Sequence, residues 1–402
     1  MELPYIRVGT SYYKKVNIPL ISGDKLEKLI YWNGECIRQD LGKDVLASIP
    51  KYDGFCYMPS HTNYQAEVGS FLNKYEPITH QPQPGSCIKT LEFIRHIFEE
   101  QTDLGLDYLT LMYKNPIQIL PVLCLVSKER ETGKTTFLNW LKSIYENNMT
   151  YNKNEDFRSQ FNSDWASKLI IAVDEVLLDK VEDSERIKNL STAKTFKTEA
   201  KGKDRIETEF FGKFILCSNN EDSFILIEPT ETRYWVRKVN KIPKVNVKLF
   251  EEMEVEIPAF LHFLNTREMT TTNQSRMWFT NQQIKTEALR RVIRRSRYWL
   301  ELEMAEILIS LMDDFELDEI CVCVNDLIPY LIKVGHRISR IVIIKVLKEH
   351  WKIEPVSNTH QYTRYVLCND GSVVPVSAKG RYYRVEKSKL LHFDDDDALM
   401  TV

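Results

Sequence analysis

The sequence predicts an α/β protein whose parallel sheet is covered by helices and flanked by two smaller modules. In the middle of the 402-residue chain, short apolar runs alternate with helical stretches. This alternation is typical of parallel strands that are buried on both faces. Aromatic-rich short runs mixed with turn residues come before this region, and helical spacing followed by a hairpin pattern comes after it. We therefore expect a central α/β domain between two further parts.

The composition fits a globular protein and argues against several other classes. The chain is 43% hydrophobic and 28% charged, unlike disordered or low-complexity chains. No apolar run approaches the roughly 20 residues of a membrane span, and the first residues lack a secretory signal. We expect a cytoplasmic protein with no membrane partner. The eight cysteines include no CxxC pair, so we expect them reduced and mostly buried, without a zinc ribbon.

Charge is distributed unevenly along the chain. The net charge of −3 does not by itself indicate nucleic-acid binding. However, Lys285–Arg297 holds six basic residues against one acid, and Asp394–Asp397 is an acidic run. We interpret the basic segment as an amphipathic helical linker with a solvated face. The alternative is a helix that contacts DNA.

The elements of the first two-thirds follow from hydrophobic spacing. Turn residues from Pro77 to Gly85 mark a boundary after a small N-terminal α+β or helical module. Helical spacing predicts helices starting near Ser86 and over 107–113, the second ending before Pro116. Further on, a helix is predicted over 135–145. Strands are predicted over 117–126, 169–173, 214–217 and 234–236.

The last third shows a different pattern. Helices are predicted over 302–312, from 325, and over 341–351, followed by a hairpin that turns at Asn369–Gly371. Three helices followed by a hairpin is the order of a winged helix-turn-helix. Such a domain binds duplex DNA through its third helix or serves as a protein contact, and both remain open. The cations near that helix and on the wing are Arg337, Arg340, Lys345, Lys348, Arg364, Arg381 and Arg384.

The most informative string is the loop Ser127–Thr136, between a predicted strand and a predicted helix. In a phosphate-binding loop, backbone N–H groups at a helix N-terminus hold phosphates, a lysine reaches the β- and γ-phosphates, and a hydroxyl holds Mg²⁺. The full pattern has glycine where this chain has Lys128. The alternative interpretation is a surface turn that caps a helix. The candidate ATP-binding residues are Thr132, Gly133, Lys134, Thr135 and Thr136.

Three further strings follow or precede apolar strands. Asp174 and Glu175 end one strand, where a Mg²⁺-organising acid and a water-activating acid belong. Asn219 ends the next, where its amide can hydrogen-bond an attacking water. Arg233 precedes a third strand and is placed to reach a neighbouring subunit's γ-phosphate. Taken singly, each is also compatible with an ordinary polar strand end.

Together, these strings resemble the superfamily 3 helicases. They look most like the AAA+ helicase portion of the primase–helicase family carried by phages, viruses and bacterial mobile elements. The matching strings are GKT at 133–135, VDE at 173–175, SNN at 218–220 and ETRYWV at 231–236, within about residues 70–265. The resemblance implies an AAA+ P-loop ATPase core. It implies Lys134 on phosphate, Thr135 and Asp174 on Mg²⁺, Asp174 and Glu175 as Walker B, Asn219 as sensor and Arg233 as a finger acting in trans.

In this family, the interval before the sensor carries a hairpin whose basic tip grips single-stranded DNA. Lysine makes phosphate contacts that do not depend on sequence, and glycine permits a tight turn. The alternative is a solvated lysine-rich loop. The candidate DNA-binding residues in this interval are Lys197, Lys201, Lys203 and Arg205.

The resulting hypothesis is an ATP- and Mg²⁺-dependent replicative DNA helicase of a phage or mobile element, which forms a ring that we expect to be a hexamer. Its expected partners are single-stranded DNA and fork or origin DNA, with a separate primase as a further candidate. The rivals are an AAA+ ATPase with a regulatory or defence role and no unwinding, and a non-hydrolysing origin-binding initiator. The predicted parts are an N-terminal module of unclear role at 1–85, a helical lead-in or collar at 86–116, the ATPase core at 117–265, a basic helical linker at 266–300, a winged-helix DNA-binding domain at 301–392 and an acidic tail at 393–402.

Overall fold

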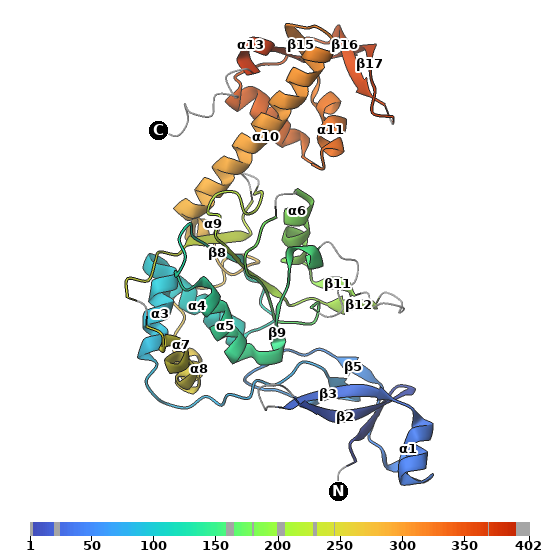
Figure 1. Cartoon of the computed structure of the whole chain (residues 1–402), viewed down its shortest axis with the longest axis vertical. Helices are drawn as coiled ribbons and strands as arrows, with labels where there is room; N and C mark the ends of the chain where they lie inside the picture. The colour runs from blue at the N-terminus through green and yellow to red at the C-terminus, as the bar shows by residue number, and fades with distance from the viewer. Residues whose placement is uncertain are drawn as a thin grey trace.

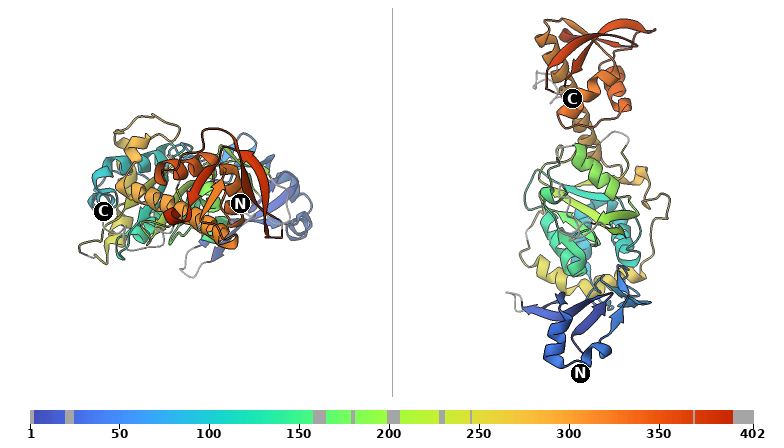
Figure 2. Two further views of the ribbon diagram at one scale, coloured as in Figure 1. Left: turned by 90° about the horizontal axis from the view of Figure 1, so that it is seen from above. Right: turned by 90° about the vertical axis from the view of Figure 1, so that its right-hand side faces the viewer.

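The chain forms an elongated molecule with its α/β core in the middle (Figures 1 and 2). The N-terminal module lies at one end of the long axis and the C-terminal domain at the other. This computed structural model describes residues 3–19, 25–157, 165–178, 181–198, 206–227, 231–244, 246–368 and 370–390. In this part of the chain, no helix is both long and apolar enough to cross a membrane.

The N-terminal module is built on a four-stranded sheet of order β3-β2-β1-β4. Its small core contains Tyr5, Ile37 and Ile49. A second sheet, of order β5-β7-β6, leads toward the core. The elements are β1 (Tyr5–Val8), β2 (Ser11–Pro19), β3 (Lys25–Trp32), α1 (Gly34–Leu41), α2 (Val45–Ser48), β4 (Lys51–Tyr52), β5 (Gly54–Cys56), β6 (Glu67–Val68) and β7 (Phe71–Asn73).

A helical layer follows the module and packs on the core. The first helix begins at Ile88 rather than near Ser86. The second begins at Thr102, earlier than the predicted start at residue 107. Asp107 on the second helix is fully buried and accepts a hydrogen bond from Arg267 at 2.6 Å, which ties this layer to the segment after α8. The helices are α3 (Ile88–Phe98), α4 (Thr102–Lys114), α7 (Leu249–Val255) and α8 (Ile257–Thr266).

The central sheet has the order β14-β8-β13-β10-β9, and all its neighbouring strands are parallel. The expectation of an α/β fold with a parallel sheet is therefore confirmed. The first predicted strand begins at residue 122 instead of 117, because Pro121 has no N–H to donate to a neighbouring strand. The strands are β8 (Val122–Val126), β9 (Met149–Tyr151), β10 (Ile170–Val173), β13 (Lys213–Ser218) and β14 (Tyr234–Lys238).

Both faces of this sheet are covered because successive side chains point to opposite faces. Leu123 and Leu125 belong to one buried cluster with side chains of α3, α4 and α5 (Lys134–Tyr145). Cys124 and Val126 belong to a second cluster with side chains of α6 (Val181–Leu190) and α10. The all-apolar strands reflect burial on both sides.

An antiparallel hairpin lies between α6 and β13. It pairs β11 (Thr195–Thr198) with β12 (Ile206–Glu209), and Thr198 lies opposite Ile206. In Figure 1 this hairpin extends sideways from the core.

The C-terminal domain is joined to the core by a single helix, α10 (Glu287–Asp314). This helix runs through residue 300, where the sequence predicted a change from linker to domain. The predicted hairpin is present, and Gly371 in its turn has a φ of 87°. The remaining elements are α9 (Asn281–Ile284), β15 (Glu319–Val322), α11 (Val324–Lys333), α12 (Arg340–Lys345), the π-helical turn Val346–His350, β16 (His360–Leu367), β17 (Val373–Gly380), β18 (Tyr383–Glu386) and α13 (Lys387–Leu390).

All eight cysteines are free, and three of them are buried: Cys87, Cys124 and Cys217. The expectation that most are buried is therefore wrong. The other five lie in the two flanking modules, on or directly beside short strands and helices that have solvated faces, as the exposed Cys36 on α1 illustrates.

Candidate functional site

The predicted phosphate loop lies at the carboxyl edge of the sheet, between β8 and α5. Gly133 immediately precedes α5 and has a φ of 93°, a backbone conformation that favours glycine. A Cβ at this position would lie 3.0 Å from the Phe93 ring, so the site has no room for a side chain. The first N–H groups of α5, starting at Lys134, have no partner within the helix. The loop therefore offers the backbone geometry that binds anions.

Lys134 extends into the space between the loop and the neighbouring strand end. It is 6% exposed, and its Nζ donates to Ser127 Oγ, to Thr132 Oγ1 at 3.2 Å and to Asn219 Oδ1 at 3.1 Å. Burial lowers the pKa of Lys134, while the charges of nearby groups, among them Asp174 and Glu221, oppose this shift. No described carboxylate forms an ion pair with it. A buried ammonium among neutral oxygens favours an anionic ligand.

Thr135 and Asp174 meet beside this lysine. The Thr135 hydroxyl donates to Asp174 Oδ2 at 2.8 Å, which joins the start of α5 to the end of β10. Glu175 is exposed next to them, with a φ of 60°. Among the residues described, no group of three or more His, Cys, Asp or Glu forms a metal site. Mg²⁺ commonly binds through one or two protein oxygens together with substrate phosphates, and the Thr135–Asp174 pair fits that requirement.

Arg233 does not lie with these residues. Its carbonyl accepts the N–H of Val122, at the amino end of β8, so the five residues of this strand, roughly 17 Å, separate it from the phosphate loop. Its guanidinium binds both oxygens of Glu231, at 3.0 and 2.8 Å, and its side chain is 27% exposed. Glu231 also pairs with Lys188 of α6 at 3.3 Å. Arg233 is therefore unavailable to the phosphate loop of its own chain.

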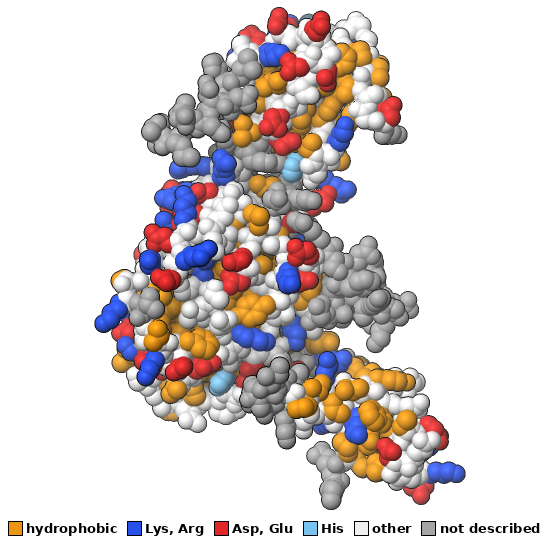
Figure 3. Space-filling view, in the orientation of Figure 1, with side chains coloured by type: hydrophobic (Ala, Val, Ile, Leu, Met, Phe, Trp, Pro, Cys, Tyr) orange, Lys and Arg blue, Asp and Glu red, His pale blue; other side chains and the backbone are white. Residues whose placement is uncertain are grey.

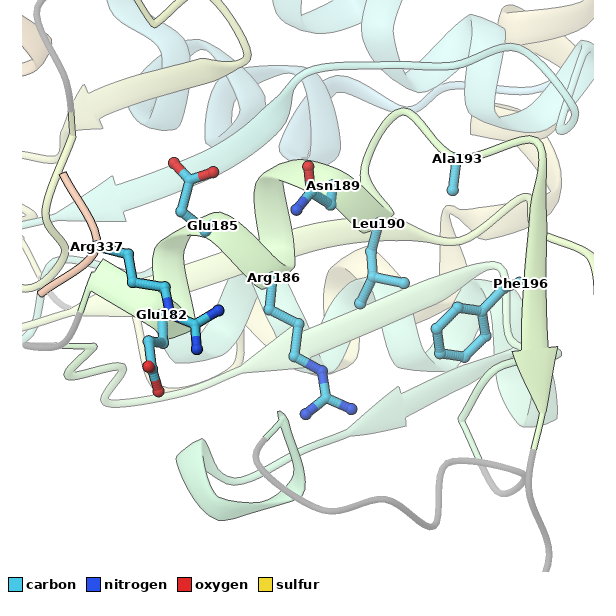
Figure 4. A pocket seen from close by; sticks show the side chains of 8 residues that line it. All are labelled: Glu182, Glu185, Arg186, Asn189, Leu190, Ala193, Phe196 and Arg337. Carbon is cyan, nitrogen blue, oxygen red and sulfur yellow. The ribbon is translucent and has the colours of Figure 1, made fainter. Parts of the chain in front are cut away.

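Of the predicted DNA-binding residues, Lys197 is exposed on β11. Lys201, Lys203 and Arg205 lie outside the described residues. A hollow at the base of the hairpin lies along α6, and Arg337 reaches it from the C-terminal domain (Figure 4). The C-terminal domain therefore adjoins the helix that leads into the hairpin. The hollow is lined by Glu182, Glu185, Arg186, Asn189, Leu190, Ala193, Phe196 and Arg337.

From Glu287 onward, the basic segment Lys285–Arg297 lies in the first half of α10. Its apolar residues Leu289 and Val292 are buried against the core, and Arg290 and Arg294 are 51% and 72% exposed. Figure 3 shows basic side chains gathered over this part of the molecule. This is an amphipathic helix with a solvated basic face, as the linker interpretation predicted.

The C-terminal domain carries a basic hollow between the start of α11, α12 and the hairpin β16–β17. Asp326 is the acid that lines it, and it already pairs with Arg364 at 2.8 Å. The hollow therefore has a clear excess of positive charge. Its cations are Arg340, Lys348, Arg364, Lys379 and Arg381.

Sequence reasoning missed two residues of the phosphate site, Ser127 and Glu221. Ser127 contacts Lys134, and its position directly after a buried strand was an available signal. Glu221 is 5% exposed and accepts the N–H of Lys128 at 3.0 Å. No periodicity marks an acid in a turn as buried. Lys128 has no positive φ, so the missing glycine is not required by the backbone there.

Two comparisons place the chain among known proteins. A model for a family of unknown function (DUF5906) matches residues 125–234, which run from the end of β8 to the start of β14. The sequence matches none of the curated proteins. An apo structure of the NrS-1 C-terminal region (305-718) is 16% identical and has a TM-score of 0.59, over 92% of this chain and 94% of that chain. Another apo structure of that region, in its A form, is 17% identical with a TM-score of 0.58, over 91% and 94%. The likeness shows that most of this chain shares the fold of that region.

We predict that Gly133→Ala costs more stability than a matched substitution elsewhere. Gly335 has the same φ of 93°, but no atom lies within 4 Å of the place that a Cβ would take, so Gly335→Ala carries backbone strain alone. That strain costs about 1–3 kcal/mol. Gly133→Ala adds the contact with Phe93, and chemical denaturation should show a larger loss of unfolding free energy. Equal losses for the two variants would contradict this account of the loop.

Proposed function

We propose that the chain is an ATP- and Mg²⁺-dependent DNA helicase of superfamily 3 type, with an AAA+ P-loop core and a C-terminal winged helix. The observation that carries the proposal is the buried Lys134 ammonium, held by neutral oxygens beside the Thr135–Asp174 pair. This arrangement leaves a positive charge for phosphate and two oxygens for a metal ion.

The described residues divide the chemistry among them. Lys134 and the N–H groups at the start of α5 hold the phosphates, and Thr135 with Asp174 holds Mg²⁺. Bound Mg²⁺ neutralises phosphate charge as it develops. Glu175, exposed at the same edge, orients and deprotonates the attacking water. Asn219 accepts a hydrogen bond from Lys134 at 3.1 Å, and would act as the sensor that responds to loss of the terminal phosphate.

The position of Arg233 supports a ring of subunits. It lies at the opposite edge of the sheet from its own phosphate loop, so it serves a site only on a neighbouring subunit. There it would stabilise the transition-state charge, in the manner of an arginine finger. We propose a closed ring, most simply a hexamer, in which the β11–β12 hairpins approach single-stranded DNA. A separate primase would complete the replication machinery of a phage or mobile element.

The first prediction of this proposal concerns ATP hydrolysis. Lys134→Ala should abolish nucleotide binding, because it removes the cation that faces the phosphates. Glu175→Gln should bind ATP but hydrolyse it about 10²–10⁴-fold more slowly, the usual contribution of a general base. Lys89→Ala, which removes an exposed lysine of α3, is the control. Wild-type turnover no faster than that of Lys134→Ala would instead support a non-hydrolysing initiator.

The second prediction concerns the hairpin. Lys201→Ala combined with Lys203→Ala should leave basal ATP hydrolysis intact and remove its stimulation by single-stranded DNA. Unwinding of a forked DNA should be lost as well, since phosphate contacts by lysine provide the grip. The double variant Lys244→Ala, Lys248→Ala removes the same charge from exposed positions near the start of α7. A wild-type enzyme that hydrolyses ATP without unwinding would favour a regulatory or defence ATPase.

The third prediction concerns the basic hollow of the C-terminal domain. If it binds duplex DNA, as proposed for a winged helix, Arg340→Ala and Lys379→Ala should each weaken duplex binding. Each should also reduce the slope of log K against log salt by about one, the effect of one lost phosphate contact. Arg384→Ala is the matched control, because Arg384 lies on β18 and pairs with Glu319 outside the hollow. Unchanged binding and slopes would favour a protein contact.

A further inference from the structure

Glu221 is a buried carboxylate for which the proposed chemistry gives no role. It lies in the turn after β13 and is 5% exposed. Its Oε1 accepts the N–H of Lys128 at 3.0 Å and lies 3.3 Å from Lys238 Nζ, and its Oε2 lies 3.9 Å from Arg291. Burying a carboxylate costs free energy unless such partners offset it, so the contacts of Glu221 are needed to keep it in this buried position.

The three partners come from three elements that surround the phosphate site. Lys128 is the second residue of the phosphate loop, Lys238 ends β14, and Arg291 lies on α10. Only one of the three contacts uses the backbone, and that is the contact to the loop. The side chains of Lys238 and Arg291 are 47% and 48% exposed, and such partly exposed pairs contribute little to stability.

The backbone contact lies at a point that determines where Lys134 is held. Ser127, which precedes Lys128, and Asn219, two residues before Glu221, both accept hydrogen bonds from Lys134 Nζ. Ser127 N–H also donates to Ser218 O at 3.1 Å. The Glu221 bond to Lys128 is therefore a second link between the phosphate loop and the end of β13. It lies next to Ser127 and Asn219, whose oxygens hold Lys134.

We propose that Glu221 is a positioning residue of the phosphate site: its carboxylate oxygen fixes Lys128, near the start of the phosphate loop, against the strand end that carries Asn219. This inference rests on the proposed nucleotide-binding function. It also accounts for Lys128 at the position where the common pattern has glycine, because this loop is held by a hydrogen bond to its backbone.

Three substitutions separate the hydrogen bond from the charge. Glu221→Gln loses the charge but keeps an oxygen that accepts the Lys128 N–H. Glu221→Asp keeps the charge but is one methylene too short to reach that N–H. Glu221→Ala loses both. Asp222→Asn is the control, because Asp222 is the next residue and its carboxylate pairs with the exposed side chain of Lys128, at 3.7 Å, and not with the Lys128 backbone.

The experiment measures binding of a fluorescent ATP analogue to the whole chain, with Lys134→Ala as the reference for lost binding. Glu221→Ala and Glu221→Asp should bind about 10- to 100-fold more weakly, the effect expected for a hydrogen bond to a charged group. Glu221→Gln should stay within about threefold of wild type, and Asp222→Asn within about twofold. Thermal unfolding without nucleotide checks that each variant is folded.

Wild-type affinity in a folded Glu221→Asp or Glu221→Ala variant would overturn the inference. So would a Glu221→Gln variant as weak as Glu221→Asp, because the charge rather than the hydrogen bond would then matter. If Glu221→Ala does not fold, comparing the affinities of Glu221→Gln and Glu221→Asp for the analogue still tests the inference. A wild-type chain that binds no more analogue than Lys134→Ala would contradict the proposed nucleotide-binding function itself. That result differs from the Glu221 results above, in which the wild-type chain binds the analogue.

Discussion

The buried ammonium of Lys134 is the constraint on which the candidate site depends. A charge that is 6% exposed needs compensation, and three neutral oxygens supply it only in part. Those oxygens come from the loop after β8 and from the end of β13. They meet because parallel strands bring their carboxyl ends to one edge of the sheet. The packing of the apolar strands therefore allows the Lys134 ammonium to be held where it is shielded from solvent.

The direction of the parallel strands also separates the phosphate loop from Arg233, the two parts of the proposed chemistry. The phosphate loop lies at the carboxyl edge, whereas Arg233 lies at the amino edge and is held by Glu231. A guanidinium with a carboxylate partner is stable in a single chain, and it needs no neighbour for folding. A neighbouring phosphate would have to compete with Glu231 for it. Subunit contact, rather than folding, would therefore decide when Arg233 takes part.

Much of this fold follows from local patterns in the sequence. Alternation and helical spacing predicted β10, β13, β14 and α5 nearly to their ends, because burial on two faces leaves continuous apolar runs. The three-residue strand β9 was missed because it is too short to show a period. The helix α10 continues through residue 300, where the predicted linker meets the predicted C-terminal domain, and its buried residues pass from the central core at Val292 to the C-terminal core at Leu300.

The site was predicted less completely than the fold. The phosphate-loop pattern marks Lys134 and Thr135, and strand ends mark Asp174 and Asn219. The structure brings these four residues together, and their roles are proposals. Glu221 carries no such mark. Its burial arises only when β13, β14 and α10 are packed together, so it depends on contacts between residues far apart in sequence.

The helix α10 connects this packing to the C-terminal domain. It has 28 residues and is therefore about 42 Å long. Val292 packs in the core, and Leu308 packs in the C-terminal domain. It contains neither proline nor glycine, the usual causes of a sharp kink, and Thr286 fixes its start to the carbonyl of Val236 on β14. The C-terminal domain is thus carried on a stiff rod anchored beside the phosphate site.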